Sequence, residues 1–148
     1  MPTENGLQQM ITILMCLVIS VADGDTLTVL CNGSKQVKIR LSEIDAPEKR
    51  QPFGNRSMQS LSGMCLQKKA KIKPQTKDRY GRTVARVICD GIDANEEQVK
   101  RGMAWVYDRY VRDRNLYSIQ DMARASKIGL WADNKPIKPW EYRRANKR

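Results

Sequence analysis

Three short segments of the sequence hold acids and arginines at spacings that suit phosphate chemistry. They read DGDT at 23–26, RLSEIDAPE at 40–48 and DRYGR at 78–82. Carboxylate and carbonyl oxygens are the ligands that calcium and magnesium prefer, and arginine binds phosphate through two parallel N–H groups. These residue types therefore predict a metal-assisted site that handles a phosphorylated substrate.

The composition narrows the chemistry further. The 148 residues include no histidine, which excludes catalytic triads, paired-histidine mechanisms and histidine-bound metals. Lys and Arg outnumber Asp and Glu by 27 to 16, for a net charge of +11. Such a charge favours nucleic acid as the partner, although solubility or an anionic membrane surface would also account for it. Four cysteines without CxxC spacing disfavour a zinc site.

In the first segment, Asp25 begins a strand whose inward positions continue as Leu27 and Val29. Its carboxylate should therefore lie on the core side at the rim of the sheet, where an ionised acid needs a cation. The alternative is an Asx-turn acid in a tight hairpin, which accounts well for Asp23 and poorly for Asp25.

In the second segment, Asp45 and Glu48 follow a strand that ends near Arg40, and Pro47 fixes the backbone so that the Ala46 carbonyl has a set direction. Two acids and an aimed carbonyl indicate a hard-metal site, whereas a charged turn that caps the sheet is the simpler alternative. In the third segment, Arg82 follows a Tyr-Gly turn at the start of a strand and should point its guanidinium towards the same rim.

The elements that must position these residues follow from hydrophobic periodicity and turn signals. Asp23-Gly24 between two apolar runs predicts a hairpin. The pattern predicts five strands, at 16–22, 25–31, 37–41, 70–73 and 83–89. It also predicts three helices, at 55–66, from Asn95 to about Gly102, and at 115–128. In the second helix Asn95 and Gln98 should form a capping box and Gly102 should be the stop, and Gly129 should end the third. This order favours the α+β class, with a five-stranded OB-fold barrel and three helices.

One domain at 16–140 is expected, with a basic tail at 141–148 that should be a disordered arm. The segment 1–15 is a candidate degenerate export signal, because the apolar run from Met10 to Ile19 suits a signal peptide but lacks basic residues before it and a cleavage site after it. The run is too short to cross a bilayer, so no stable membrane insertion is expected. We expect a monomer.

Taken together, the three segments resemble the staphylococcal nuclease (thermonuclease) family, from about Cys16 to Trp131. The resemblance implies calcium rather than magnesium, bound by Asp25, Asp45 and the backbone carbonyl of Ala46, where better-known members carry threonine. It implies that Glu48 activates the attacking water and that Arg40 and Arg82 hold the phosphate. It also implies hydrolysis of DNA or RNA that leaves 3′-phosphate ends.

Around this site, Arg79, Tyr80, Tyr107 and Tyr110 are expected to hold the substrate, the tyrosines by stacking on bases or by bonding to phosphates. For each tyrosine, a place in the core or on the surface is the alternative. The competing function is a non-catalytic OB-fold module that binds nucleic acid or another partner, for which the acids would be a liability.

The positions of the four cysteines indicate disulfides and, through them, the cellular compartment in which the protein works. If Asp23 and Gly24 form the two-residue loop, counting outward sets position 22 against 25, 20 against 27 and Cys16 against Cys31, within disulfide reach. Cys65 and Cys89 then pair by elimination. A β-bulge would shift this register by one residue, and four free thiols are the alternative. Two disulfides would place the protein in the periplasm or outside the cell rather than in the cytoplasm.

Overall fold

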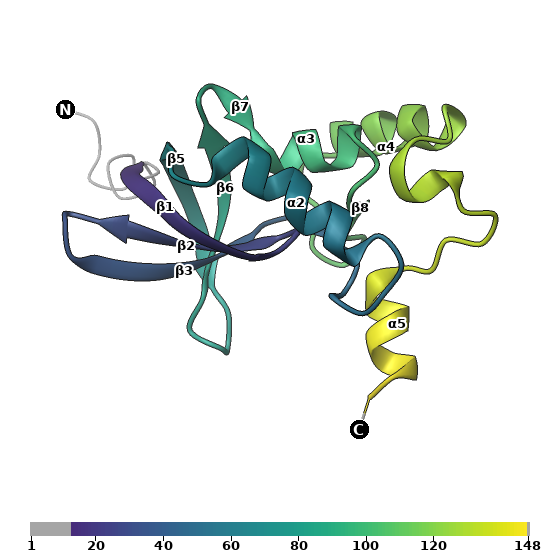
Figure 1. Ribbon diagram of the computed structural model, residues 1–148, viewed down its shortest axis with the longest axis horizontal. Coiled ribbons are helices and arrows are strands. Elements are labelled where there is room, and N and C mark those ends of the chain that lie inside the picture. Colours follow the sequence, from purple (N-terminus) through teal and green to yellow (C-terminus); the bar gives the residue numbers. More distant parts are fainter. Residues whose placement is uncertain (1–12, 148) are drawn as a thin grey trace, which may run out of the picture.

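Five strands of the computed structural model, which describes residues 13–147, curl into a closed barrel (Figure 1). They are β1 (Leu14–Asp23), β2 (Thr26–Cys31), β3 (Lys35–Leu41), β5 (Lys69–Lys77) and β6 (Thr83–Cys89). Neighbouring strands pair antiparallel in the order β3-β2-β1-β5-β6, and a parallel pairing of β3 with β6 closes the barrel. The expected α+β OB-type barrel is confirmed.

Three shorter strands complete the sheet structure. β7 (Ile92–Asp93) pairs with β6, and β4 (Ile44–Asp45) pairs with β8 (Trp105–Val106) in a separate two-stranded sheet. The β4–β8 pair matters for function because it fixes the segment that follows β3, in which two of the predicted site acids lie.

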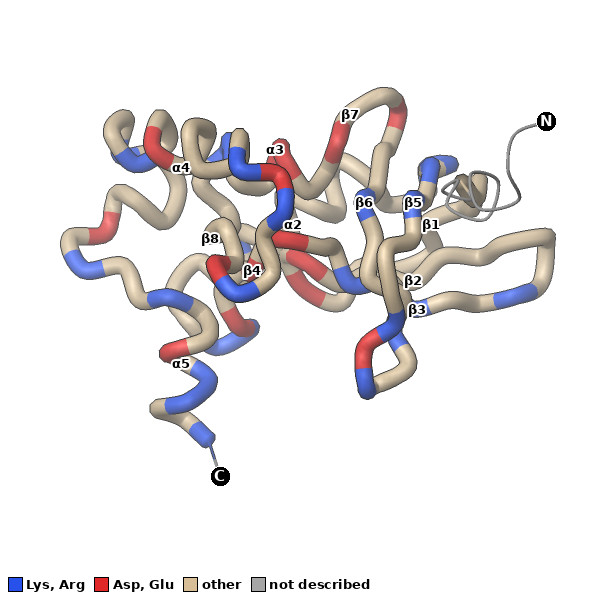
Figure 2. Tube along the Cα trace, turned by 180° about the vertical axis from the view of Figure 1, so that it is seen from behind, with Lys and Arg blue, Asp and Glu red and all other residues tan. Residues whose placement is uncertain are grey.

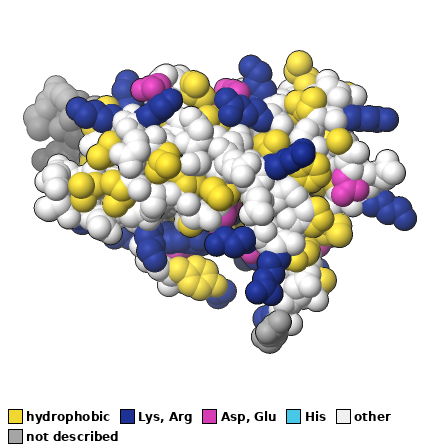
Figure 3. All heavy atoms as spheres, viewed as in Figure 1, with side chains coloured by type: hydrophobic (Ala, Val, Ile, Leu, Met, Phe, Trp, Pro, Cys, Tyr) yellow, Lys and Arg dark blue, Asp and Glu magenta, His cyan; other side chains and the backbone are white. Residues whose placement is uncertain are grey.

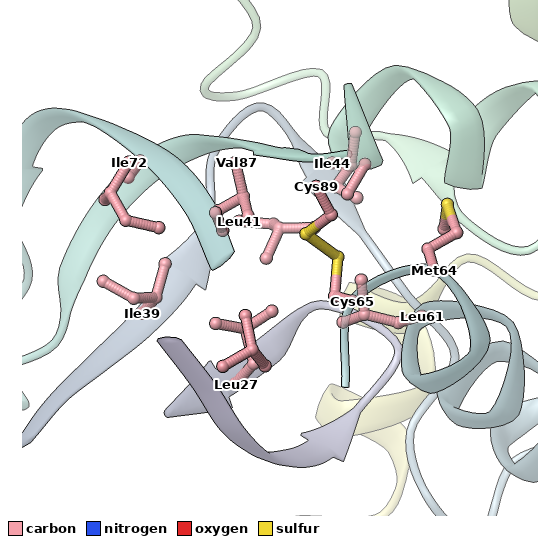
Figure 4. Packing of buried hydrophobic residues seen from close by; sticks show 14 of the residues in the cluster. Leu27, Ile39, Leu41, Ile44, Leu61, Met64, Cys65, Ile72, Val87 and Cys89 are labelled. Atoms are coloured by element: carbon pink, nitrogen blue, oxygen red, sulfur yellow. A yellow bond between two sulfur atoms is a disulfide. The ribbon is translucent and has the colours of Figure 1, made fainter. Parts of the chain in front are cut away.

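Alternating side chains explain why these segments form a barrel. In β6 every second residue from Thr83 to Cys89 is buried, and β2 buries Leu27, Val29 and Cys31 in the same way. This period of two directs one face of each strand inward. Figure 4 shows the resulting core, in which side chains from the strands meet those of helix α2 (Gly54–Cys65).

Helices α2 (Gly54–Cys65) and α3 (Ala94–Lys100) pack on strands of the barrel, and α4 (Asn115–Ala125) packs on α3. A 3₁₀ turn at Gly129–Ala132 leads to α5 (Pro139–Ala145), which contacts Tyr107 and Trp105 through Trp140. Three were expected, and α5 is the addition. The expectation that the basic tail is a disordered arm is wrong, because residues 139–145 are helical. Pro139 in the first turn, Glu141 near the N-terminus and Arg143 and Arg144 in the last turn all favour this helix.

The start of α3 also differs from the expectation. Asp93, not Asn95, caps the helix, by accepting a hydrogen bond of 3.0 Å from the Glu96 N–H. Asn95 is buried and bonds to the backbone of Val87 and of Ser42, while Gln98 donates to the carbonyl of Gly24 at 2.8 Å. The predicted capping box is therefore wrong, because tertiary contacts to buried backbone groups use both side chains.

At the other end of α3, Gly102 adopts the left-handed conformation that the sequence predicts (φ 68°). Helix α4 ends at Ala125, three residues before the expected Ile128, and Gly129 follows with φ 57°. Gly102 therefore stops α3 as expected, whereas the left-handed residue that follows the end of α4 is Lys127 (φ 54°), and Gly129 instead begins the 3₁₀ turn.

Both predicted disulfides are present. Cys16 and Cys31 lie opposite each other on β1 and β2 with Cα atoms 4.6 Å apart, and Cys65 of α2 bonds Cys89 of β6 at 5.3 Å. The register near the turn is not the expected one, because Asp23 pairs with Thr26 and the loop is Gly24-Asp25. Two irregularities in β1, between Val18 and Ser20 and between Val21 and Asp23, restore the pairing at the cysteines.

The N-terminal segment can be assessed only in part. Residues 16–21 lie in β1, as expected, whereas the proposed export signal falls largely on residues 1–12, outside the described part of the chain. Between Ile13 and Lys147, no helix has the length and apolar character needed to cross a membrane.

Candidate active site

All three motifs converge on one open cleft, with a volume of about 980 Å³. Figure 2 shows acidic positions in the middle of the molecule, between the β5–β6 turn and α5. Nine of the ten predicted site residues line this cleft: Asp25, Arg40, Asp45, Glu48, Arg79, Tyr80, Arg82, Tyr107 and Tyr110. The tenth, Ala46, is buried and does not line the cleft, but its backbone N–H donates a hydrogen bond to Asp25.

Asp25 lies at the tip of the β1–β2 hairpin and is 6% exposed. Its Oδ2 accepts a hydrogen bond of 2.8 Å from the Ala46 N–H, and its Oδ1 accepts one of 3.0 Å from the Thr26 hydroxyl. The Arg40 guanidinium lies 3.4 Å from Oδ2. The carboxylate thus lies at the barrel rim beside a cation, as the sequence predicts.

The Arg40 side chain is fixed between two acids. Its Nη1 donates to the carbonyls of Leu41 at 2.6 Å and Ile44 at 2.9 Å, while its Nη2 lies 3.3 Å from Asp45 Oδ1. With both ends of the fork engaged, the guanidinium keeps one orientation facing the cleft.

Asp45 is completely buried, in β4, and a second arginine reaches it from α5. Arg143 places Nη2 2.7 Å from Asp45 Oδ2 and Nη1 3.0 Å from both Asp45 Oδ1 and Glu48 Oε2. The sequence predicts Arg143 only as part of the basic tail. Its signal in the sequence is the Pro139 to Arg144 helix pattern, which places Arg143 in an ordered element but does not indicate its partner.

Burial and close spacing shift the pKa values of Asp23, Asp25 and Asp45. Burial, together with the nearby charge of Asp25, raises the pKa of Asp23 to about 7. Burial, opposed by the hydrogen bonds from Arg143 and reinforced by the charge of Asp25, raises the pKa of Asp45 to about 6. Burial alone would raise the pKa of Asp25, but the charge of Arg40 and hydrogen bonds, including that from Ala46, keep it below its ordinary value. In this partly dry space, Asp25 and Asp45 depend on the positive charges of Arg40 and Arg143.

The Asp78 carboxylate holds Arg82 at the other side of the cleft. Arg82 Nε lies 2.7 Å from Asp78 Oδ2, and the Arg82 N–H donates to Oδ1 at 3.0 Å. Tyr80 is 68% exposed and its hydroxyl accepts a bond of 2.8 Å from Arg79, with both arginines near its ring. This turn presents two guanidinium groups and an exposed ring to whatever enters the cleft.

The two other tyrosines differ in what they offer. The ring of Tyr107 stacks on Trp140 of α5, with centroids 5.1 Å apart, and its hydroxyl accepts a bond of 3.3 Å from Arg143. One face of that ring is therefore occupied. Tyr110 packs edge-to-face on Tyr107 and is 53% exposed, so its ring is accessible to a substrate base.

The donor set fits a loosely held hard cation. Asp25 and Asp45 direct carboxylate oxygens to the same guanidinium, within 3.4 Å and 3.3 Å. Over residues 13–147, no group of three or more His, Cys, Asp and Glu side chains forms a metal cage. Two carboxylates and one carbonyl would leave coordination positions to water and to a phosphate oxygen.

Comparisons with known proteins agree with this geometry. The family described as "Staphylococcal nuclease homologue" matches residues 38–133. The chain is 48% identical over 132 residues to an uncharacterized endonuclease of Haemophilus influenzae, covering 89% of this chain and 74% of that protein. It is 36% identical over 141 residues to a micrococcal nuclease of Shigella flexneri, covering 88% and 80%. The chain belongs to the staphylococcal nuclease family.

Proposed function

We propose that this protein is a calcium-dependent nuclease that hydrolyses phosphodiester bonds of DNA or RNA and leaves 3′-phosphate ends. The family supports a phosphodiesterase that acts on nucleic acid, and two of its similar proteins are named as endonucleases or nucleases. The observation that carries the proposal is the convergence of Asp25, Asp45, Glu48, Arg40 and Arg82 on one cleft.

In this proposal the acidic residues bind the metal and activate water, and the arginines bind the phosphate. Asp25, Asp45 and the carbonyl of Ala46 would hold the calcium ion, which when bound supplies positive charge to a phosphoryl oxygen. Arg40 and Arg82 bind the equatorial oxygens, where negative charge grows as water attacks phosphorus. Glu48 takes a proton from that water, the bond from phosphorus to the 5′ oxygen breaks, and the departing 5′ oxygen takes a proton from solvent, so that the phosphate stays on the 3′ side.

The charge of the molecule suits a polyanionic substrate. The net charge is +11, and on the face shown in Figure 3 the Lys and Arg side chains outnumber the Asp and Glu side chains. A basic surface raises the rate of encounter with a polynucleotide.

A cleavage assay that reads the ends tests the proposal. Purified protein is incubated with plasmid and with a labelled oligonucleotide in calcium, in magnesium or in chelator. We expect cleavage in calcium, loss of cleavage in chelator, and fragments that a polymerase extends only after phosphatase treatment. Full cleavage in chelator would refute the metal requirement, and fragments that extend without phosphatase would refute the product polarity.

We propose further that the protein works in an oxidising compartment outside the cytoplasm. Disulfides persist in exported proteins and are rare in the reducing cytoplasm, and Cys16–Cys31 and Cys65–Cys89 use all four cysteines. Alkylation of the protein in intact cells, followed by mass analysis, checks this. Thiols that are fully alkylated before reduction would contradict it.

A further inference from the structure

The C-terminal helix brings a third arginine into the cleft. Arg143 extends from α5 to Asp45 and Glu48, residues that precede it by 98 and 95 positions. Its guanidinium bonds both oxygens of Asp45, at 3.0 Å and 2.7 Å, and one oxygen of Glu48 at 3.0 Å. This arginine therefore joins a proposed metal ligand to the proposed base.

Aromatic packing holds α5 in the position that makes this contact. Trp140 stacks on Tyr107 with an interplanar angle of 12° and meets Trp105 edge-on, with centroids 6.1 Å apart. Just before the helix, the Ile137 carbonyl accepts a bond of 2.6 Å from Gln51. Figure 1 shows α5 (yellow) below the loop that leads into α2. The helix is thus a built element of the site.

The contacts of Asp45 conflict with a metal ion at the same carboxylate. Arg143 and Arg40 together engage both of its oxygens. A divalent ion bound through Asp45 needs at least one of these oxygens and would lie within a few ångströms of a guanidinium, where like charges repel. Of the two arginines, Arg40 is held by two backbone carbonyls, whereas the Arg143 side chain is 37% exposed and bonds only side chains. Arg143 is therefore the one that can leave.

We propose that Arg143 is a resident cation of the metal site, which neutralises Asp45 and Glu48 before the metal binds and must release Asp45 when it does. This inference rests on the proposed function, since it assumes the calcium site. A site that is open for only a fraction of the time binds its ligand with an affinity reduced by that fraction. Helix α5 would thereby set the calcium concentration at which the enzyme becomes active.

The two possible roles of Arg143 predict opposite changes in calcium affinity when this residue is removed. If Arg143 only orients Asp45 and Glu48 for the metal, its removal should weaken calcium binding. If it competes with the metal, its removal should strengthen calcium binding and destabilise the metal-free protein, because buried Asp45 then loses a cation. Calcium affinity therefore separates the two roles, which activity alone would not.

The test compares Arg143→Gln with Arg144→Gln, an exposed arginine at the next position of α5 that does not line the cleft. Calcium is titrated calorimetrically into chelator-treated, full-length protein without substrate. We expect Arg143→Gln to bind calcium about tenfold more tightly than wild type, a difference typical of one charge-assisted contact. Its melting temperature without calcium should fall, and Arg144→Gln should match wild type in both measurements.

A third variant keeps the test decisive if Arg143→Gln does not fold without calcium. Arg143→Lys retains the charge but loses the two-pronged contact, so its calcium affinity should lie between those of wild type and Arg143→Gln. Calcium binding that is unchanged or weaker in the Arg143 variants would overturn this inference and leave the proposed function standing. Failure of wild type and all variants to bind calcium, together with cleavage in chelator, would instead remove the proposed function and this inference with it.

Discussion

Each charged residue to which we assign a catalytic or metal-binding role contacts an opposite charge. Arg40 lies between Asp25 and Asp45, Arg143 holds Glu48, and Asp78 holds Arg82. Removing a buried member leaves its partner uncompensated, which costs several kcal/mol of stability. Glu48 and Arg82 are more exposed, at 37% and 28% of their side chains, and so allow chemistry to be tested apart from folding.

Glu48→Gln should lower turnover by about 10²-fold or more, because a general base typically contributes an effect of that size. Its stability should change little, since the ion pair with Arg143 is partly exposed. Initial rates at saturating substrate and thermal unfolding measure the two effects. Glu97→Gln is the matched control, because Glu97 also pairs with an arginine but does not line the cleft. Near wild-type turnover in Glu48→Gln would remove Glu48 from the mechanism.

Arg82→Ala should also lower turnover by about 10²-fold, because it removes a fixed positive charge from the growing charge on the phosphate. Arg101→Ala provides the comparison. It breaks another ion pair between residues four apart, with Glu97, away from the cleft. Single-turnover rates of the two variants should differ by at least tenfold, since of Arg82 and Arg101 only Arg82 contacts the substrate in the proposed mechanism. Equal rates would show that Arg82 is a surface arginine.

The sequence predicts the acids and arginines of the site because each lies in a short motif at a strand end. It does not predict Arg143, because the contact joins α5 to β4 across 98 residues and no local pattern reports a partner at that distance. The covered face of Tyr107 was missed for the same reason, since Trp140 belongs to the same distant helix. Long-range contacts of this kind depend on how the finished elements pack.

At the scale of elements, periodicity predicts the strands and helices better than it predicts how their ends are made. Asn95 has the right residue type for a cap, yet its buried amide bonds β6 and the chain after β3 instead. Counting residues outward from the predicted turn gives the correct Cys16–Cys31 pair, although the turn lies one residue later than expected. Two irregularities in β1 compensate for this shift in register. A bulge inserts one residue into one strand of a pair, so the strand pattern alone does not fix the register near a turn.

Gly129→Ala should destabilise the protein by about 2 kcal/mol, through left-handed strain and a collision. Gly129 has φ 57°, and an added Cβ would overlap the carbonyl oxygen of Gly102. Gly63→Ala is the control. Gly63 lies in α2, and a Cβ added there would have no atom within 4 Å. Because alanine favours the helix over glycine, this variant should be more stable by about 0.5–1 kcal/mol. Denaturant unfolding of both variants checks the opposite signs, and a Gly129→Ala protein as stable as wild type would contradict the strain argument.

The double variant Cys65→Ala with Cys89→Ala should lose about 3 kcal/mol of unfolding free energy, because the bridge closes a long loop in the unfolded chain. The two cysteines are 24 residues apart and both are fully buried. Denaturant midpoints without reductant measure the loss. Reductant should then shift wild type further than the variant, since wild type still has two bridges to lose. An unchanged midpoint in the variant would show that packing alone joins α2 to β6.

At the scale of the whole molecule, the excess of basic side chains should make substrate binding strongly dependent on salt. For Glu48→Gln in chelator, affinity for a short fluorescent single-stranded oligonucleotide should fall by at least about tenfold between 50 and 200 mM salt. Fluorescence anisotropy across that range should give a straight line of log affinity against log salt. Binding that does not change with salt would point to stacking on Tyr80 and Tyr110, rather than phosphate contacts, as the main source of affinity.

The parallel pairing of β3 with β6 also has a kinetic consequence. It joins Ile39 to Thr83 and Arg40 to Val84, so closing the barrel requires the ends of a loop of about 44 residues to meet. Loop closure of this length costs entropy that local hairpins do not, which makes it a slow event in folding. Because Arg40 lies in this pairing and Arg82 directly precedes it, a chain that has formed its hairpins but not closed the barrel has no complete cleft. Enzymatic activity should therefore return only in the last phase of refolding, after most of the strand signal has recovered.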